Sequence, residues 1–432
     1  MSGNEAITGA LLLAEFFLFL ESIRRAGFLL IPNGALGLIV VYQIVFFFTN
    51  EGYVENVFLL TYWLGGLYDN FKLTEIFYAA VFAFIYLSTK DFRQFDRRIV
   101  SQALTTTISE QNISKFSKWC AWGLGTYFIL FAVSVRWDVI WSNSTYLAMA
   151  TPDTVILPDL SSLAALIRMI APVGIVSACL CAITLSRRLW PLALFFAACW
   201  IFVFIFQAGA HERGATAIAG LFVITYILLS PRINWAIITA TVAAGLLSYP
   251  LAIIGRGLPM QGISSIFFTF DMFSSVDFKA FFDLAITNLC EGIFVFAESI
   301  SAPVSYPLTY KLLSFSPLPS AIDHYESIRP YFQIRLSESV PLSGFAEVYK
   351  FGVGYSALLF LYFFLVIRIH HKVRDSNPTA FFLANTFLFL SFFMLNAYPL
   401  RNGLKFMLVA AVVSILALAL QTQQDANKNR AK

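Results

Sequence analysis

Charged residues are scarce in this sequence. Asp, Glu, Lys and Arg make up 12% of its 432 residues, about half of the share that is usual in soluble proteins, whereas hydrophobic residues make up 59%. The apolar residues come in long runs that a water-facing surface cannot cover, which excludes a soluble enzyme and a disordered chain. The formal net charge of +4 is too small to define a surface for a polyanion, so we expect no nucleic-acid partner.

Groups that hold metals are also sparse. The sequence has five Cys and four His residues, and no Cys spacing fits zinc or an iron–sulfur cluster. Cys179 and Cys181 form a C-x-C pair, but residues two apart on a helix face different directions. No D-x-D motif and no His/Asp cluster occurs in the segments expected to face outward. We therefore expect no metal and no cofactor.

Long apolar runs dominate the rest of the sequence. A transmembrane helix needs about 20 apolar residues, and the runs predict an all-α, polytopic membrane protein with about 12 transmembrane helices in a single transmembrane domain over 1–432. The weakest span, 53–69, contains Gly65 and Gly66 and is either a span or a re-entrant or interfacial segment. The predicted spans are 6–22, 27–48, 53–69, 73–89, 119–136, 161–185, 189–207, 214–230, 234–254, 351–369, 378–398 and 402–420.

Basic residues predict which side of the membrane each connection occupies. The stretch 90–118 holds six basic residues against three acidic ones and is expected to be cytoplasmic. Arg24 and Arg25 are the exception: with twelve spans they fall outside, and without 53–69 they fall inside. The other clusters on the cytoplasmic side are Arg187/Arg188, Arg232, Arg368/Lys372/Arg374 and Lys428/Arg430/Lys432.

One outer connection is much longer than the others. The loop at 255–350 has about 95 residues, and loops of this length are usually functional or disordered. It is rich in Phe, Leu and Ile, with amphipathic stretches such as 281–300. It is divided into pieces by prolines at 303, 307, 317, 319, 330 and 341. It is therefore predicted to form short amphipathic helices at the outer membrane interface.

Five arginines lie on this outer side, where basic residues are normally depleted. They either anchor the chain to lipid phosphates or converge to bind a pyrophosphate leaving group, because the planar guanidinium forms paired bonds to phosphate oxygens. Arg213 stands at a helix N-terminus, which favours an anion, and Arg256 lies between two glycines. The five are Arg213, Arg256, Arg329, Arg335 and Arg401.

Four further side chains are candidates for the same site. His324 lies in the outer loop and can act as the general base for a sugar hydroxyl, or be a loop histidine bonded to Asp323 or water. His211 either supports Arg213 or caps the turn. Glu347 can orient an arginine or accept a proton, and Tyr349 can hydrogen-bond a sugar; alternatively, both belong to a solvated helix start.

These residues together resemble the bacterial O-antigen polymerases (Wzy-type) of the O-antigen polymerase and ligase superfamily. The likeness lies in the span number, the large late outer loop, the Arg in HERGA before a span, the Arg in GRG that opens the loop, and the late His. Its most specific part is PLSGFAEVYKFGVG at 341–354. As residues, the resemblance covers roughly 200–405.

The resemblance implies a metal-independent glycosyltransferase in the bacterial inner membrane, with its active site facing the periplasm. It implies that Arg213 and Arg256 bind the pyrophosphate of an undecaprenyl-linked glycan, and that His324 activates the acceptor hydroxyl. The roles of Arg329, Arg335 and Arg401 rest on the charge argument. Expected partners are the lipid-linked glycan, membrane lipids and a chain-length regulator protein.

Two other functions remain open. An O-antigen ligase, which transfers the finished glycan to lipid A core, would use the same residues. A transporter or flippase would instead carry charges inside its spans, for which Glu15 and Arg168 are the main candidates.

Overall fold

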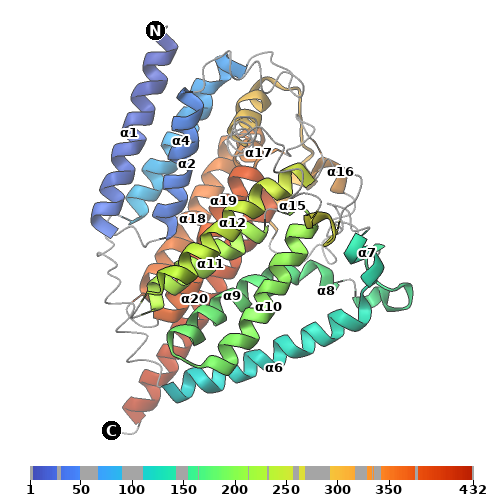
Figure 1. Ribbon diagram of the computed structural model, residues 1–432. Helices are drawn as coiled ribbons and strands as arrows, with labels where there is room; N and C mark the ends of the chain where they lie inside the picture. The colour runs from blue at the N-terminus through green and yellow to red at the C-terminus, as the bar shows by residue number, and fades with distance from the viewer. Residues whose placement is uncertain are drawn as a thin grey trace. The chain divides into compact units, whose positions relative to one another are not determined.

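Figure 1 shows the computed structural model of the chain, which forms two compact units. Unit 1 comprises Met1–Asp96 with Phe282–Lys432, and unit 2 comprises Arg97–Phe281. In the described ranges the backbone is helical, with one isolated bridge between Val135 and Ile156 and no strand. The structure describes residues 3–26, 31–48, 67–89, 110–142, 154–163, 165–212, 214–230, 233–255, 262–267, 292–316, 328–332, 334, 342–374 and 378–430.

Helices account for most of both units, as expected where apolar surroundings force backbone groups to bond within the chain. In unit 1 the helices are α1 (Gly3–Ala26), α2 (Ile31–Phe48), α4 (Leu67–Thr89), the helix Gly292–Ser301, α15 (Leu308–Ser314), α16 (Arg329–Phe332), α17 (Gly344–Phe351), α18 (Val353–Val373), α19 (Pro378–Ala397) and α20 (Leu400–Arg430). In unit 2 they are α6 (Glu110–Ser134), α7 (Trp137–Ser142), the 3₁₀ helix Pro158–Leu163, α8 (Ala165–Arg168), α9 (Ile170–Ser186), α10 (Trp190–Gly209), α11 (Gly214–Leu229) and α12 (Trp235–Gly255).

Helices coincide with the apolar runs of the sequence. Every predicted span overlaps a helix, although of 53–69 only residues 67–69 are described, at the start of α4. Within the described part of the chain, five helices are long and apolar enough to cross a membrane. This identifies a helical membrane protein, and the number of twelve spans stays a prediction. The five segments are Ala6–Arg25, Asn70–Thr89, Trp190–Gly209, Val353–Val373 and Leu400–Ala419.

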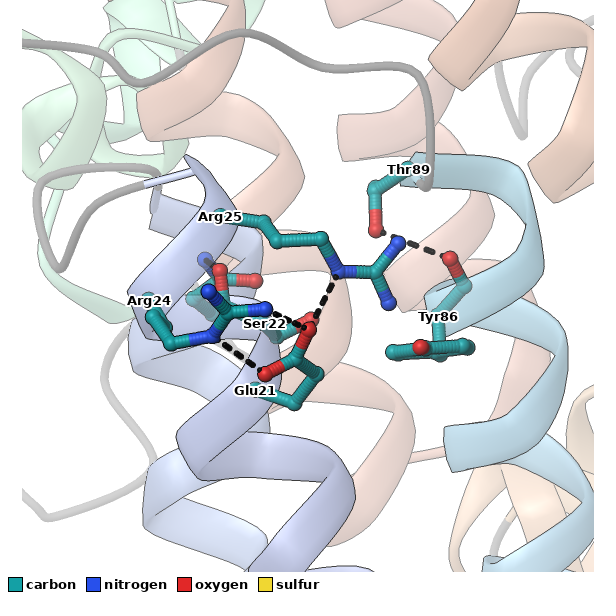
Figure 2. Close-up of polar contacts among 7 residues, drawn as sticks. Glu21, Ser22, Arg24, Arg25, Tyr86 and Thr89 are labelled. Atoms are coloured by element: carbon teal, nitrogen blue, oxygen red, sulfur yellow. Dashed lines mark hydrogen bonds and ion pairs between the residues drawn. The ribbon is translucent and has the colours of Figure 1, made fainter.

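The first three helices of unit 1 alternate in direction. Figure 2 shows the end of α1, where Arg24 and Arg25 bond to Glu21 and the Arg25 guanidinium lies 4.0 Å above the ring of Tyr86, near the end of α4. The ends of α1 and α4 therefore meet, so these helices run parallel. By contrast, α2 runs antiparallel to α1, since Asn33 near its start donates to the carbonyl of Ser22.

The described parts of the 255–350 loop differ in how far they match an interfacial helix. In α15, Tyr310 and Ser314 are buried while Leu308 and Leu312 are exposed, which fits the prediction. The helix Gly292–Ser301 differs, because residues 292–299 are all buried. Phe296 in this helix packs edge-on against Phe77 of α4, with ring centroids 5.3 Å apart. This helix is thus a core element of unit 1.

Candidate functional site

The predicted site residues fall into two groups, one in each unit. In unit 1, the start of α17 is fixed on the turn between α19 and α20. The Ser343 hydroxyl caps α17 by accepting from the amide of Ala346, and the Gly344 amide donates to the carbonyl of Tyr398 at 2.7 Å. A Cβ at Gly344 would lie 2.9 Å from Cα of Leu400, so only glycine permits this approach.

Glu347 lies in the first turn of α17 and is 1% exposed. Its Oε1 accepts a hydrogen bond from the hydroxyl of Tyr310 in α15 at 2.5 Å, and its Oε2 accepts from the amide of Leu400 at 2.7 Å. That amide is one of the N–H groups that the first turn of α20 leaves without a helical partner. One carboxyl group therefore ties together α15, α17 and α20.

Burial makes Glu347 titrate near neutral pH. Loss of water raises its pKa to about 8, although the hydrogen bonds from Tyr310 and Leu400 act in the opposite direction. Burial and the neighbouring Glu347 raise the pKa of Tyr310, so its hydroxyl keeps its proton and donates. A carboxyl with such a pKa can take up and release a proton under physiological conditions.

Arg401 and Tyr349 have packing roles in unit 1. Arg401 is 1% exposed, and its Nη1 donates to the carbonyl of Leu313 at 2.5 Å, near the end of α15. A cation there also suits the negative end of a helix. The ring of Tyr349 lies edge-on to Phe77 and Phe296, with centroids 6.1 and 5.6 Å away. The predicted contacts of Arg401 with pyrophosphate and of Tyr349 with sugar stay predictions.

The remaining unit 1 candidates are not described as side chains. Arg329 is the first residue of α16, but its side chain lies outside the described residues, as do Arg335 and His324. Glu347 of α17 and Arg401 of α20 therefore both hydrogen-bond to α15. The expected clustering of the outer arginines stays a prediction.

In unit 2, the second group surrounds His211. This residue follows α10, adopts a left-handed backbone conformation (φ 54°) and is 1% exposed. Its Nε2 hydrogen-bonds with the hydroxyl of Ser265 at 3.1 Å. Because Ser265 donates its own proton to the carbonyl of Gly262 at 2.7 Å, we assign the Nε2 proton to the imidazole, which donates to Ser265.

The His211 ring packs directly against the end of α12. A Cβ at Gly255 would lie 2.1 Å from Cε1 of His211, so the imidazole occupies the space that a side chain there would fill. The turn itself is held by the Glu212 amide, which donates to the carbonyl of Gln207 at 2.9 Å. The end of α12 and the turn between α10 and α11 therefore meet at His211.

Arg213 and Arg256 themselves lie outside the described residues. Their chain neighbours are the residues that meet: Arg213 is two residues from His211, and Arg256 follows Gly255. The structure thus brings together the two segments that carry the predicted pyrophosphate ligands. The supporting role of His211 beside Arg213 stays a prediction, because Arg213 is not described.

Gln207 is a candidate that the sequence analysis missed. It is fully buried, and a Cβ at Gly214 would lie 2.7 Å from its Oε1, so its amide faces the first residue of α11. Neither amide atom has a hydrogen-bond partner in the described ranges. A single Gln in the apolar run FVFIFQAG is the signal that identifies it, since such a group is costly unless it finds a partner.

Neither group has the ligands of a metal site: no three His, Cys, Asp or Glu side chains are grouped to hold an ion within the ranges that the structure covers. No protein-family model, no curated protein and no solved structure matches this chain. The resemblance to O-antigen polymerases therefore rests on the quoted residues alone.

Replacing Gly255 by Ala tests the contact with His211. The new methyl group would overlap the imidazole, so we expect the ring to shift and the free energy of unfolding to fall by about 1–3 kcal/mol, the usual effect of overpacking. Thermal unfolding of the purified protein in detergent measures this.

Gly220→Ala is the matched control, because a Cβ at Gly220 in α11 meets nothing within 4 Å. This variant is expected to be as stable as the wild type or slightly more so. Equal stability of Gly255→Ala and Gly220→Ala would contradict the packing of His211 on α12.

Proposed function

We propose that this protein polymerises undecaprenyl-pyrophosphate-linked repeat units at the periplasmic face of the bacterial inner membrane. A hydroxyl of the incoming lipid-linked repeat attacks the anomeric carbon of the growing glycan, a new glycosidic bond forms, and undecaprenyl pyrophosphate leaves. The donor is already activated, so the reaction requires no nucleotide sugar.

The contact between His211 and Gly255 carries this proposal. It joins the chain segments next to Arg213 and Arg256, since Arg213 is two residues from His211 and Arg256 follows Gly255. Paired bonds from two arginines stabilise a diphosphate most when its bond to carbon breaks and its charge grows. The N-terminus of α11, at Gly214, adds its positive end.

The acceptor hydroxyl must lose a proton, and His324 or Glu347 takes it. Glu347 titrates near neutral pH, as a base requires. Its carboxyl is nevertheless buried, with both oxygens already bonded, which suits a positioning residue that holds α15. We therefore assign the base to His324, which lies ten residues after Ser314, the end of α15, and positioning to Glu347.

The membrane supplies the other part of the proposal. The apolar helices form grooves for polyprenyl tails, and the outer loop covers the sugars. Arg329, Arg335 and Arg401 add positive charge on the outer side, and Tyr349 binds sugar. Lipids and a chain-length regulator are the proposed partners.

Deletion of the gene tests the proposal when the surface glycans are separated on a stained gel. Loss of the ladder, with a single capped repeat retained, supports a polymerase. Loss of all surface attachment, with polymer left on the lipid carrier, shows a ligase instead. An unchanged ladder contradicts both.

A transporter or flippase is the second candidate, because two carboxyl groups, Glu15 and Glu75, are fully buried inside apolar helices. Ionisable groups at such positions often mark transport pathways. Arg168 does not add to this argument, since its side chain lies outside the described residues. In the deletion strain a flippase defect would leave lipid-linked repeats on the cytoplasmic side, without the capped single repeat.

A further inference from the structure

Three polar side chains are buried together among the first three helices of unit 1. Glu15 comes from α1, Gln43 from α2 and Glu75 from α4, and each is 0% exposed. In α1 and α4 these residues lie within segments long and apolar enough to span a membrane. Helix α1 packs on both α2 and α4, so the three side chains come from neighbouring helices.

The burial of Glu15 follows from the pattern of α1. Leu12 and Ser22 are buried with it on one face, whereas Leu13, Phe16 and Phe17 are exposed. The apolar side chains therefore face outward, where a bilayer can cover them, and the carboxyl faces the helical bundle. The same parallel arrangement that sets Arg25 against Tyr86 brings Glu15 to the level of Glu75.

Glu15 is close enough to Glu75 and to the Gln43 amide for electrostatic interaction with both. In the part of the chain that the structure describes, the oxygens of both carboxyls and the amide atoms of Gln43 have no hydrogen-bond partner. The nearby Tyr78 hydroxyl does not donate its proton to either carboxyl, because it donates to Oδ1 of Asn396 at 2.6 Å.

No cation neutralises the two carboxyls among the described residues. Arg24 and Arg25 bond to Glu21 at the end of α1. Lys72, one helical turn before Glu75, forms no ion pair with it. Other titratable groups lie on the helices packed against this cluster: Tyr42 of α2, Tyr78 and Tyr86 of α4, and Tyr355, Tyr362, Arg368, His370, His371 and Lys372 of α18.

We propose that Glu15 and Glu75 form a proton-binding site, in which one of the two carboxyls holds a proton and the buried Gln43 amide is the third polar group. Two ionised carboxylates buried side by side repel each other and lose their hydration, so one of them keeps its proton. The amide offers both a donor and an acceptor, which matches one protonated and one ionised carboxyl. This inference does not depend on the proposed function.

Infrared spectroscopy of the full chain in lipid vesicles tests the site. Because Glu347 also has a raised pKa, the measurement is made in a Glu347→Gln background. At neutral pH we expect the C=O stretch of a protonated carboxyl in this background and its loss when Glu15→Gln and Glu75→Gln are added. Glu21→Gln is the matched control on the same helix, and it should keep the band, because Glu21 is solvent-accessible and bonded to arginine. A spectrum of the Glu347→Gln background without the band overturns the proposal.

A second measurement needs no variant. Dicyclohexylcarbodiimide, a lipid-soluble reagent, modifies protonated carboxyls in apolar surroundings, and peptide mass spectrometry locates the adduct. We expect modification of Glu15 or Glu75 and none of Glu21. Loss of both the adduct and the infrared band when sodium replaces choline in the buffer would show a monovalent-cation site and overturn the assignment to a proton.

Discussion

Cells that carry Arg213→Ala or Arg256→Ala are expected to make no long-chain glycan, although the protein reaches the membrane in normal amounts. Each change removes a guanidinium from the proposed pyrophosphate site, and loss of one such group from a charge-stabilising site lowers the rate by about 10²–10³-fold. A stained glycan gel measures chain length, and an immunoblot of membranes measures the amount of protein.

Two controls separate the loss of the site from the loss of a charge. Lysine at 213 or 256 keeps the charge but cannot make the paired bonds of a guanidinium, so we expect a partial ladder. Arg136→Ala removes an arginine of unit 2 that bonds to Asp138 at 3.2 Å and is 42% exposed, and it should leave the ladder intact. A normal ladder in either Arg213→Ala or Arg256→Ala refutes the proposed pyrophosphate site.

Glu347→Ala is expected to lower the free energy of unfolding by about 3 kcal/mol, because the Tyr310 hydroxyl and the Leu400 amide lose their acceptor in a buried place. The wild type should also lose stability as the pH rises. The Glu347 carboxyl binds a proton more tightly in the folded protein (pKa about 8) than in the unfolded chain (4.5). The stabilisation is therefore fully present below pH 4.5 and is lost as the pH rises through about 8.

Glu347→Gln cannot titrate, so its unfolding temperature should vary less than that of the wild type between pH 5 and pH 8. Tyr310→Phe removes a hydrogen bond that lowers the pKa of Glu347, and it should shift the pH-dependent loss of stability to higher pH. Thermal unfolding in detergent over a pH series gives both results. Equal pH dependence in Glu347→Gln and the wild type would contradict the raised pKa.

The positions of the helices could be predicted from the sequence because a membrane helix is encoded locally, by a run of apolar residues. The break between α17 and α18 is also local: it falls at Gly352, whose φ of 106° is unfavourable for other residues. The burial of Gly292–Ser301 was not predictable in this way. Its residues look amphipathic in sequence, and its burial depends on packing against distant elements, such as Phe77 of α4 and Tyr349 of α17.

The partners of the site residues were harder to predict than the residues themselves. Glu347 stands out in the sequence, but Tyr310 and Leu400 lie 37 and 53 positions away, and nothing local marks either of them. The contact of His211 with Gly255 is similar, since it depends on how α10 and α12 converge. Arg401 was expected to face an anion, whereas the structure shows its bond to the backbone of Leu313.

The parallel direction of α1 and α4 also determines whether the number of membrane crossings between them is odd or even. If both helices cross the bilayer, the chain crosses an odd number of times between them, and α2 supplies one crossing. A further single crossing by 53–69 would make α1 and α4 antiparallel, in conflict with the contact between Arg25 and Tyr86. If 90–118 is cytosolic, as its basic residues predict, one crossing fewer also places Arg24 and Arg25 on the cytosolic side, where they cease to be an exception among the basic clusters.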